Sequence, residues 1–98
     1  MDSIRVTVRT SLVFKDIFGN WRFGLKLPKG STFQDFIDEL IKTWGDQLAP
    51  HLFQTDGQML RPNIMCMING HNIRFLDNLE TELKQDDEIL ILPPVGGG

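Results

Sequence analysis

The stretch from Ser31 to Gly45, STFQDFIDELIKTWG, carries the clearest structural signal in the sequence. Ser31 and Gln34 have capping-box spacing, and Thr32 is an equally good N-cap with Asp35 in the first turn. Gly45 suits the position that follows a helix C-terminus. Large apolar residues recur between these ends with the spacing of a helix buried along one stripe: Phe33, Phe36, Ile37, Leu40, Ile41 and Trp44. The pattern predicts one helix that packs this stripe against a sheet.

The segments before this helix have the alternation of strands. From Ile4 to Phe14, apolar and polar residues alternate at the start, and from Trp21 to Leu27 they alternate throughout. Gly19-Asn20 lies between the two segments and is a turn signal. The sequence therefore predicts a hairpin that is closed by Pro28-Lys29-Gly30 before the helix begins.

The segments after the helix are less regular at first. Residues 46–62 are interrupted by Pro50, Gly57 and Pro62, so we expect a loop with at most a short helical turn. Asn69-Gly70 is the strongest hairpin signal of the chain. The remaining expected elements are strands at 63–68, 71–75 and 88–92, a helical turn within 79–83 and a polar turn at Asp86-Asp87.

This order of elements is strand, strand, helix, strand, short strand, strand. It predicts an α+β fold of the β-grasp type, as in ubiquitin, with a mixed sheet of four to five strands covered by one main helix. The first and last strands would be parallel neighbours in the centre of the sheet. We expect residues 1–93 to form this domain and residues 94–98 to form a flexible tail.

The composition is that of an ordinary globular domain. The 98 residues are 41% hydrophobic and 23% charged, and the net charge of −3 argues against nucleic acid as the main partner. The single cysteine excludes an internal disulfide framework. We expect a cytoplasmic protein without a membrane partner, since residues 1–5 lack the pattern of a signal peptide and no run approaches about 18 apolar residues.

The last strand is apolar on both faces, because Ile89 and Ile91 alternate with Leu90 and Leu92. A central strand flanked by long side chains would explain this, and so would a face that binds a partner. Alternation alone leaves open which pair points outward, and we take Leu90 and Leu92 as the outward pair. The other residues assigned to this partner-binding face are Met65 and Met67, as adaptable apolar contacts, and Arg5 and Arg9, as cations at its rim.

The sequence holds no convincing catalytic or metal-binding constellation. Cys66 alternates with Ile64 and Ile68 and is expected to be a core thiol. His51 and His71 are isolated from other metal-ligating residues, so no metal site is predicted. No Ser–His–Asp arrangement, catalytic carboxylate pair or nucleotide fingerprint occurs, and an enzyme that acts alone is not expected.

The segment that remains is PPVGGG, residues 93–98. Glycine has no Cβ, so such a tail is thin and adopts backbone angles that other residues avoid. Six extended residues span about 20 Å, enough to reach into the active site of another protein. The alternative interpretation is a frayed terminus or an expression remnant.

Several segments resemble motifs of the MoaD/ThiS family of ubiquitin-like sulfur carriers. In that family a hairpin reads I-N-G, a turn reads L-K-D-G-D-E-V, the ending reads P-P-V-S/A-G-G, and P-E-G-A/S-T opens the helix. The corresponding segments here are ING at 68–70, LKQDDEI at 83–89, PPVGGG at 93–98 and PKGST at 28–32. The Pro-Pro-Val ending is most similar to the small subunit of molybdopterin synthase.

The resemblance implies a function for the tail. A ubiquitin-activating-type adenylyltransferase (MoeB/ThiF-like) would adenylate Gly98 with its own ATP and Mg²⁺, and a sulfur donor would convert the adenylate to a thiocarboxylate. The large subunit of molybdopterin synthase (MoaE-like) would receive the sulfur. Pro94, Val95, Gly96 and Gly97 would thread the partner's active site, and this chain would bind no cofactor.

The sequence departs from the family pattern in places that leave the pathway open. Gln85-Asp86-Asp87 replaces Asp-Gly-Asp, and Gly96 stands where Ser or Ala is common. The long segment 46–62 resembles prokaryotic ubiquitin-like modifiers. A modifier that acylates target lysines through Gly98 needs the same tail, so it remains an alternative, as does an interaction domain whose tail has no role.

Overall fold

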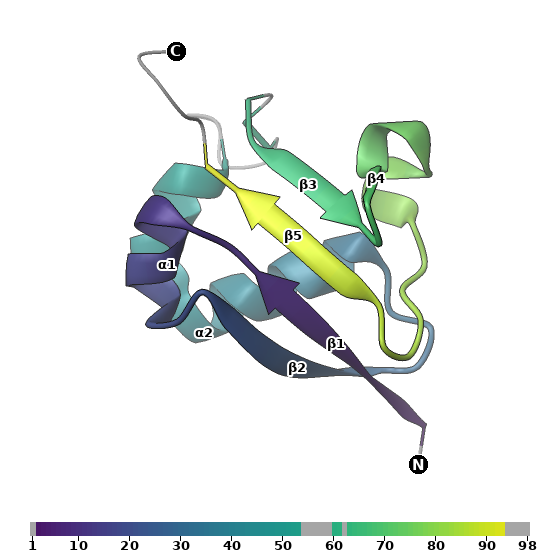
Figure 1. The fold of residues 1–98 in the computed structure, drawn as a ribbon. Coiled ribbons are helices and arrows are strands. Elements are labelled where there is room, and N and C mark those ends of the chain that lie inside the picture. Colours follow the sequence, from purple (N-terminus) through teal and green to yellow (C-terminus); the bar gives the residue numbers. More distant parts are fainter. Residues whose placement is uncertain (1, 54–59, 62, 94–98) are drawn as a thin grey trace.

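A five-stranded mixed sheet forms the centre of the fold in the computed structural model, which describes residues 2–53, 60–61 and 63–93 (Figure 1). The strand order is β2-β1-β5-β3-β4. β1 and β5 are parallel central neighbours, and the other pairs are antiparallel. The strands are β1 (Ser3–Arg9), β2 (Arg22–Pro28), β3 (Met65–Ile68), β4 (His71–Asn72) and β5 (Glu88–Leu92). This confirms the predicted β-grasp topology.

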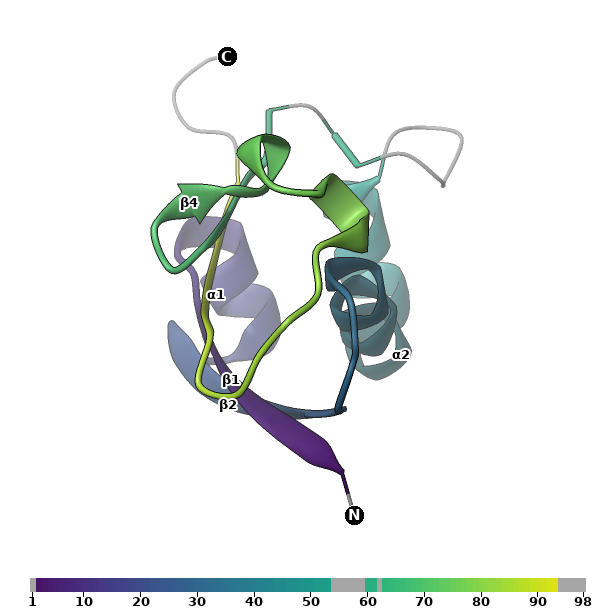
Figure 2. The same ribbon diagram turned by 90° about the vertical axis from the view of Figure 1, so that its right-hand side faces the viewer.

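One face of the sheet is covered by the main helix α2 (Phe33–Leu52), as the side view in Figure 2 shows. Of the two proposed N-caps, Thr32 is the one used: its hydroxyl accepts from the Asp35 amide at 3.3 Å, and the Asp35 carboxylate accepts from the Thr32 amide at 2.9 Å. Ser31 instead donates to the Pro28 carbonyl at 2.6 Å. The buried face of α2 carries Phe33, Phe36, Ile37 and Leu40, each fully excluded from solvent.

The first correction concerns residues 10–20, where a helix replaces the second half of the predicted strand. β1 ends at Arg9, and α1 (Leu12–Phe18) follows, so the connection to β2 is not a tight hairpin turn. Phe14 is fully buried, and three apolar neighbours pack against the core: Val13, Ile17 and Phe18. Gly19, predicted to turn a hairpin, closes α1 with φ +81° and donates its amide to the Lys15 carbonyl at 2.9 Å.

The second correction concerns the region after Gly45. The predicted C-terminal glycine does leave helical geometry (φ +49°, ψ −124°), but a helix resumes beyond this kink and continues to Leu52 despite Pro50. Leu48 and Leu52, four residues apart, are both fully buried. Burying these two side chains explains why residues 46–52 are helical rather than part of the expected loop.

The later elements are shorter than expected. The strand predicted at 63–68 begins at Met65, and the return strand at 71–75 keeps only two residues before the short helix η1 (Ile73–Phe75). The turn expected within 79–83 is η2 (Asn78–Glu80). No helix in residues 2–53, 60–61 and 63–93 is long and apolar enough to cross a membrane.

Candidate functional site

The face of the sheet opposite α2 carries the residues predicted to bind a partner. β5 buries Ile89 and Ile91 completely, while Leu90 and Leu92 point to the other face and stay partly exposed. The structure thus places the assumed outward pair on the open face. The position of β5 over α2 decides which pair of residues points outward. Alternation along the strand does not reveal this position.

The two methionines extend this apolar surface. Across the β3–β5 ladder, Met67 lies opposite Leu90 and Met65 lies opposite Leu92. Met65 is 46% exposed, which is high for a large apolar side chain within a sheet. We refer to Met65, Met67, Leu90 and Leu92 as the apolar stripe. Partly exposed apolar residues grouped in this way are typical of an interaction surface.

Arg5 and Arg9 lie beside the apolar stripe on β1 and are both exposed. Arg9 pairs with Glu88 on β5, with 3.2 Å between its Nη1 and the carboxylate oxygen. Each arginine also faces a cation on β2: Arg5 lies opposite Lys26, and Arg9 lies opposite Arg22. Arg22 and Lys26 were not among the residues predicted for this face, although their alternation with Phe23, Leu25 and Leu27 separates them from those apolar residues.

The proposed reactive tail begins where β5 ends. The end of β5 lies on the side of the sheet remote from the N-terminus (Figure 1), and Pro93, the next residue, is the last one described. An open hollow of about 460 Å³ lies beside it, lined in part by His51, Arg61 and Asn63. The guanidinium of Arg61 donates to the Pro50 carbonyl at 3.0 Å. The remaining tail residues, Pro94, Val95, Gly96, Gly97 and Gly98, lie outside the described residues.

The motif residues near Asn69 and Asp87 form a structural network rather than a reactive site. One Asp87 carboxylate oxygen accepts from the Asn69 side-chain amide at 2.8 Å, and the other accepts from the Lys84 backbone amide at 2.8 Å. The side-chain carbonyl oxygen of Asn69 accepts from the Glu88 backbone amide at 2.9 Å. Asp87 is only 9% exposed. These contacts join the β3–β4 turn to the start of β5.

Cys66 is a core thiol, as predicted. It is 4% exposed, and burial raises the pKa of its thiol from 9.0 to about 12, with Arg74 acting in the opposite direction. The thiolate is the reactive form, so the folded protein holds this sulfur in an unreactive state. Sulfur chemistry on Cys66 is therefore disfavoured.

We expect Ellman's reagent at pH 8 to modify Cys66 about 100- to 1,000-fold more slowly in the folded protein than in guanidinium. Because the pKa of the Cys66 thiol is higher in the folded than in the unfolded state, the free energy of unfolding should fall as the pH rises above 9. A Cys66→Ala, Phe75→Cys variant is the matched control, since position 75 is 88% exposed and its thiol should react at the unfolded rate. Equal rates for the folded and unfolded natural chain would contradict this assignment.

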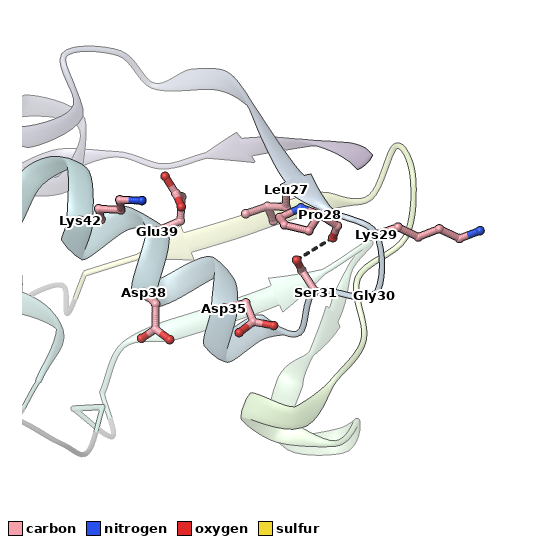
Figure 3. A pocket seen from close by; sticks show the side chains of 9 residues that line it. All are labelled: Leu27, Pro28, Lys29, Gly30, Ser31, Asp35, Asp38, Glu39 and Lys42. Carbon is pink, nitrogen blue, oxygen red and sulfur yellow. Dashed lines mark hydrogen bonds between the residues drawn. The ribbon is translucent and has the colours of Figure 1, made fainter. Parts of the chain in front are cut away.

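A second open hollow, of about 430 Å³, lies between the end of β2 and the first turns of α2 (Figure 3). Three of its polar side chains already have internal partners, because Ser31 donates to the Pro28 carbonyl, Asp35 caps α2 and Asp38 accepts from Gln34 at 2.9 Å. Among the residues that the structure describes, no group of His, Cys, Asp and Glu side chains is arranged to hold a metal ion. We assign no chemistry to this hollow.

Comparison with protein families matches residues 15–98 to the ThiS family. The chain belongs to the ThiS family. A relative from Archaeoglobus fulgidus that is assigned as a sulfur carrier protein is 43% identical over 67 residues, which are 68% of this chain and 74% of the relative. This ThiS-family chain is thus related to sulfur carriers across most of its length, and the family part of the resemblance in the sequence is confirmed.

Solved structures agree with this ThiS-family assignment. The small archaeal modifier protein 1 (SAMP1) from Methanosarcina acetivorans has a TM-score of 0.82, with 32% identity over 100% of both chains. A chain in the BexX/CysO complex from Amycolatopsis orientalis has a TM-score of 0.74 and 28% identity, over 95% of this chain and 99% of that one. The chain is therefore similar both to a sulfur carrier and to a small archaeal modifier, and neither comparison selects one pathway for it.

Proposed function

We propose that this protein is a sulfur carrier whose Gly98 carboxylate is converted to a thiocarboxylate. The observation that carries the proposal is the match to the ThiS family, which extends through Gly98. The unreactive Cys66 and the absence of a metal-binding group in the described residues also favour the tail as the reactive group.

The proposed chemistry has two steps, both catalysed by partners. A carboxylate is a poor electrophile, so a Gly98 oxygen first attacks the α-phosphorus of ATP on an adenylyltransferase and releases pyrophosphate. A sulfide-level sulfur donor then attacks the Gly98 carbonyl carbon, and AMP leaves with the original oxygen. The product carries one sulfur in place of one oxygen. This chain supplies the acyl group and a docking surface, and it binds neither ATP nor Mg²⁺.

The pathway that we propose is synthesis of the molybdenum or tungsten cofactor, with the large subunit of molybdopterin synthase as the sulfur acceptor. The Pro-Pro-Val sequence at 93–95 supports this choice, because it resembles the ending of the small subunit of that enzyme. The BexX/CysO complex, which contains a structurally similar chain, supports the idea that a domain of this kind docks on a partner protein.

Intact-mass spectrometry tests the proposed function. Co-expression with the adenylyltransferase of the same organism should add about 16 Da to the free chain, as sulfur replaces oxygen. A chain from which Gly98 is deleted should keep its mass. A natural chain that stays unmodified in the presence of active enzyme, ATP and a sulfur donor would refute the proposal.

A protein modifier is the second candidate, and the full-length similarity to SAMP1 favours it. In that case the adenylated Gly98 acylates lysine side chains of target proteins. The same mass experiment separates the two candidates. A modifier would appear as higher-mass adducts in which trypsin leaves residues 85–98 attached to the target lysine, because Lys84 is the last basic residue, and a pure carrier would produce the thiocarboxylate alone.

A further inference from the structure

The outer surface of the antiparallel β1–β2 strand pair concentrates positive charge on a protein whose net charge is −3. Four of its ten basic residues, Arg5, Arg9, Arg22 and Lys26, lie on this one face. We call these four residues the basic patch. The chain has more acidic than basic residues, so this concentration requires a local explanation.

The strand register places like charges directly opposite each other. Arg5 faces Lys26, and Arg9 faces Arg22, in the antiparallel pairing of β1 with β2. Such pairs destabilise a sheet, since their Cβ atoms lie only about 5 Å apart. Among the residues that the structure describes, Arg9 alone of the four has an ion pair, at 3.2 Å from Glu88, and that pair is about half exposed on each side.

The sheet surface between these two pairs of cations carries no bulky side chain on β2. Gly24 lies opposite Thr7, midway along the β1–β2 strand pair, and the Arg5 guanidinium extends over it. A Cβ at Gly24 would come within 2.7 Å of that guanidinium, so the missing side chain allows it to lie against the sheet. Arg5 and Arg9 are about 13 Å apart along the strand. The patch is therefore a flat, positively charged surface.

The basic patch is continuous with the apolar stripe, because Arg9 aligns with Leu90 and Leu90 aligns with Met67. An apolar centre beside exposed cations, of which only Arg9 has an ion pair in the described residues, is typical of a protein–protein interface with a charged rim. Nucleic acid would be a less suitable partner, since the chain as a whole is acidic and the neighbouring residues are apolar.

We propose that the basic patch docks onto a carboxylate-rich surface of the adenylyltransferase that activates Gly98. This inference rests on the proposed function, because that enzyme must bind the domain while its active site holds the tail. The cations steer the approach, and their mutual repulsion is relieved when acidic groups of the enzyme lie over them. The docking contact is thus separate from the tail.

The test compares the natural chain with an Arg22→Gln, Lys26→Gln variant in pyrophosphate exchange catalysed by the adenylyltransferase of the same organism. The KM for the variant should be about 5- to 20-fold higher at 50 mM salt with kcat unchanged, and the difference should disappear near 0.5 M salt. The unfolding temperature of this variant at low salt should be about 1–4 °C higher than that of the natural chain, because the repulsion between the cations of β1 and β2 is removed.

A Lys29→Gln, Lys42→Gln variant is the matched control, since these lysines border the hollow beside α2 and their loss changes the net charge equally (Figure 3). Its KM should stay within about twofold of the natural value. An unchanged KM for the β2 variant would overturn the docking proposal alone. A natural chain that the enzyme does not adenylate would overturn the proposed function and this docking partner together.

Two other occupants of the patch have their own signatures. A second copy of this chain would show as an oligomer in sedimentation that dissociates when Arg22 and Lys26 are neutralised. An RNA partner would show as binding of total tRNA that the same variant abolishes. Either result, combined with an unchanged KM, would overturn the assignment to the adenylyltransferase.

Discussion

A Gly97→Leu chain is expected to lose thiocarboxylate formation by at least about 100-fold while unfolding at the natural temperature. The proposed reaction requires the Gly98 carboxylate to enter an active site of the partner, and a branched side chain next to it would displace the reacting carbon. The described core is formed by residues between Ile4 and Ile91, so we expect the substitution at residue 97 to leave the core unchanged. Intact mass after co-expression measures the reaction, and circular dichroism measures the unfolding temperature.

Gly96→Ala is the matched control for this prediction. Ser or Ala is common at the equivalent position of the family pattern that the tail resembles, so this variant should still be converted. Equal loss in both variants would indicate that any added bulk near the tail is harmful. Full conversion of the Gly97→Leu chain would contradict a narrow channel for the tail.

An Asp87→Ala chain is expected to lose about 2–4 kcal/mol of unfolding free energy. The substitution removes both carboxylate acceptors and leaves the Lys84 backbone amide and the Asn69 side-chain amide without their 2.8 Å partners. The effect is large because Asp87 is buried and its contacts join segments 18 residues apart. Chemical denaturation should show a lower midpoint with an unchanged slope, and the unfolding temperature should fall by about 10 °C or more.

Two further variants make this prediction specific. Asp87→Asn retains one carbonyl oxygen as an acceptor, so it should lose less than Asp87→Ala. Glu82→Ala removes an exposed carboxylate that pairs with Lys84 at 3.1 Å, and it should change stability by less than about 1 kcal/mol. A midpoint for Asp87→Ala as high as that of Glu82→Ala would mean that the network contributes nothing to stability.

The family resemblance in the sequence rested partly on residues whose role turned out to be structural. The I-N-G turn and the acidic turn before β5 are far apart in the chain, yet Asn69 and Asp87 bond directly. The acidic pair Asp86-Asp87 was predicted only to form a solvated polar turn. That view holds for Asp86, which is exposed with φ +69°, and is wrong for Asp87, which is buried.

The errors in the fold have a common cause. α1 (Leu12–Phe18) and residues 46–52 are short helical segments whose apolar residues pack into the core. Phe14 and Leu48 are fully buried, although in neither segment does the apolar spacing of a helix extend over more than two turns. A pattern of one or two turns is compatible with several local structures, and tertiary burial then decides which forms.

The sequence by itself determined the elements whose signals are local. The capped helix beginning at Phe33 has more than three turns of apolar spacing, and the strand at 88–92 is bounded by polar turn residues and prolines. The order of these elements was enough to predict the β-grasp fold, and the motifs ING, LKQDDEI, PKGST and PPVGGG together suggested the family. Each of these signals is contained in one continuous segment.

Only the tertiary structure decided which residues share a surface. It placed Leu90 and Leu92 on the open face because α2 covers the face that holds Ile89 and Ile91. It also brought the cations of β2 opposite those of β1, and Asn69 to Asp87. The physical reason is that alternation specifies two faces of a strand without naming them, whereas strand register and helix packing depend on contacts between distant segments.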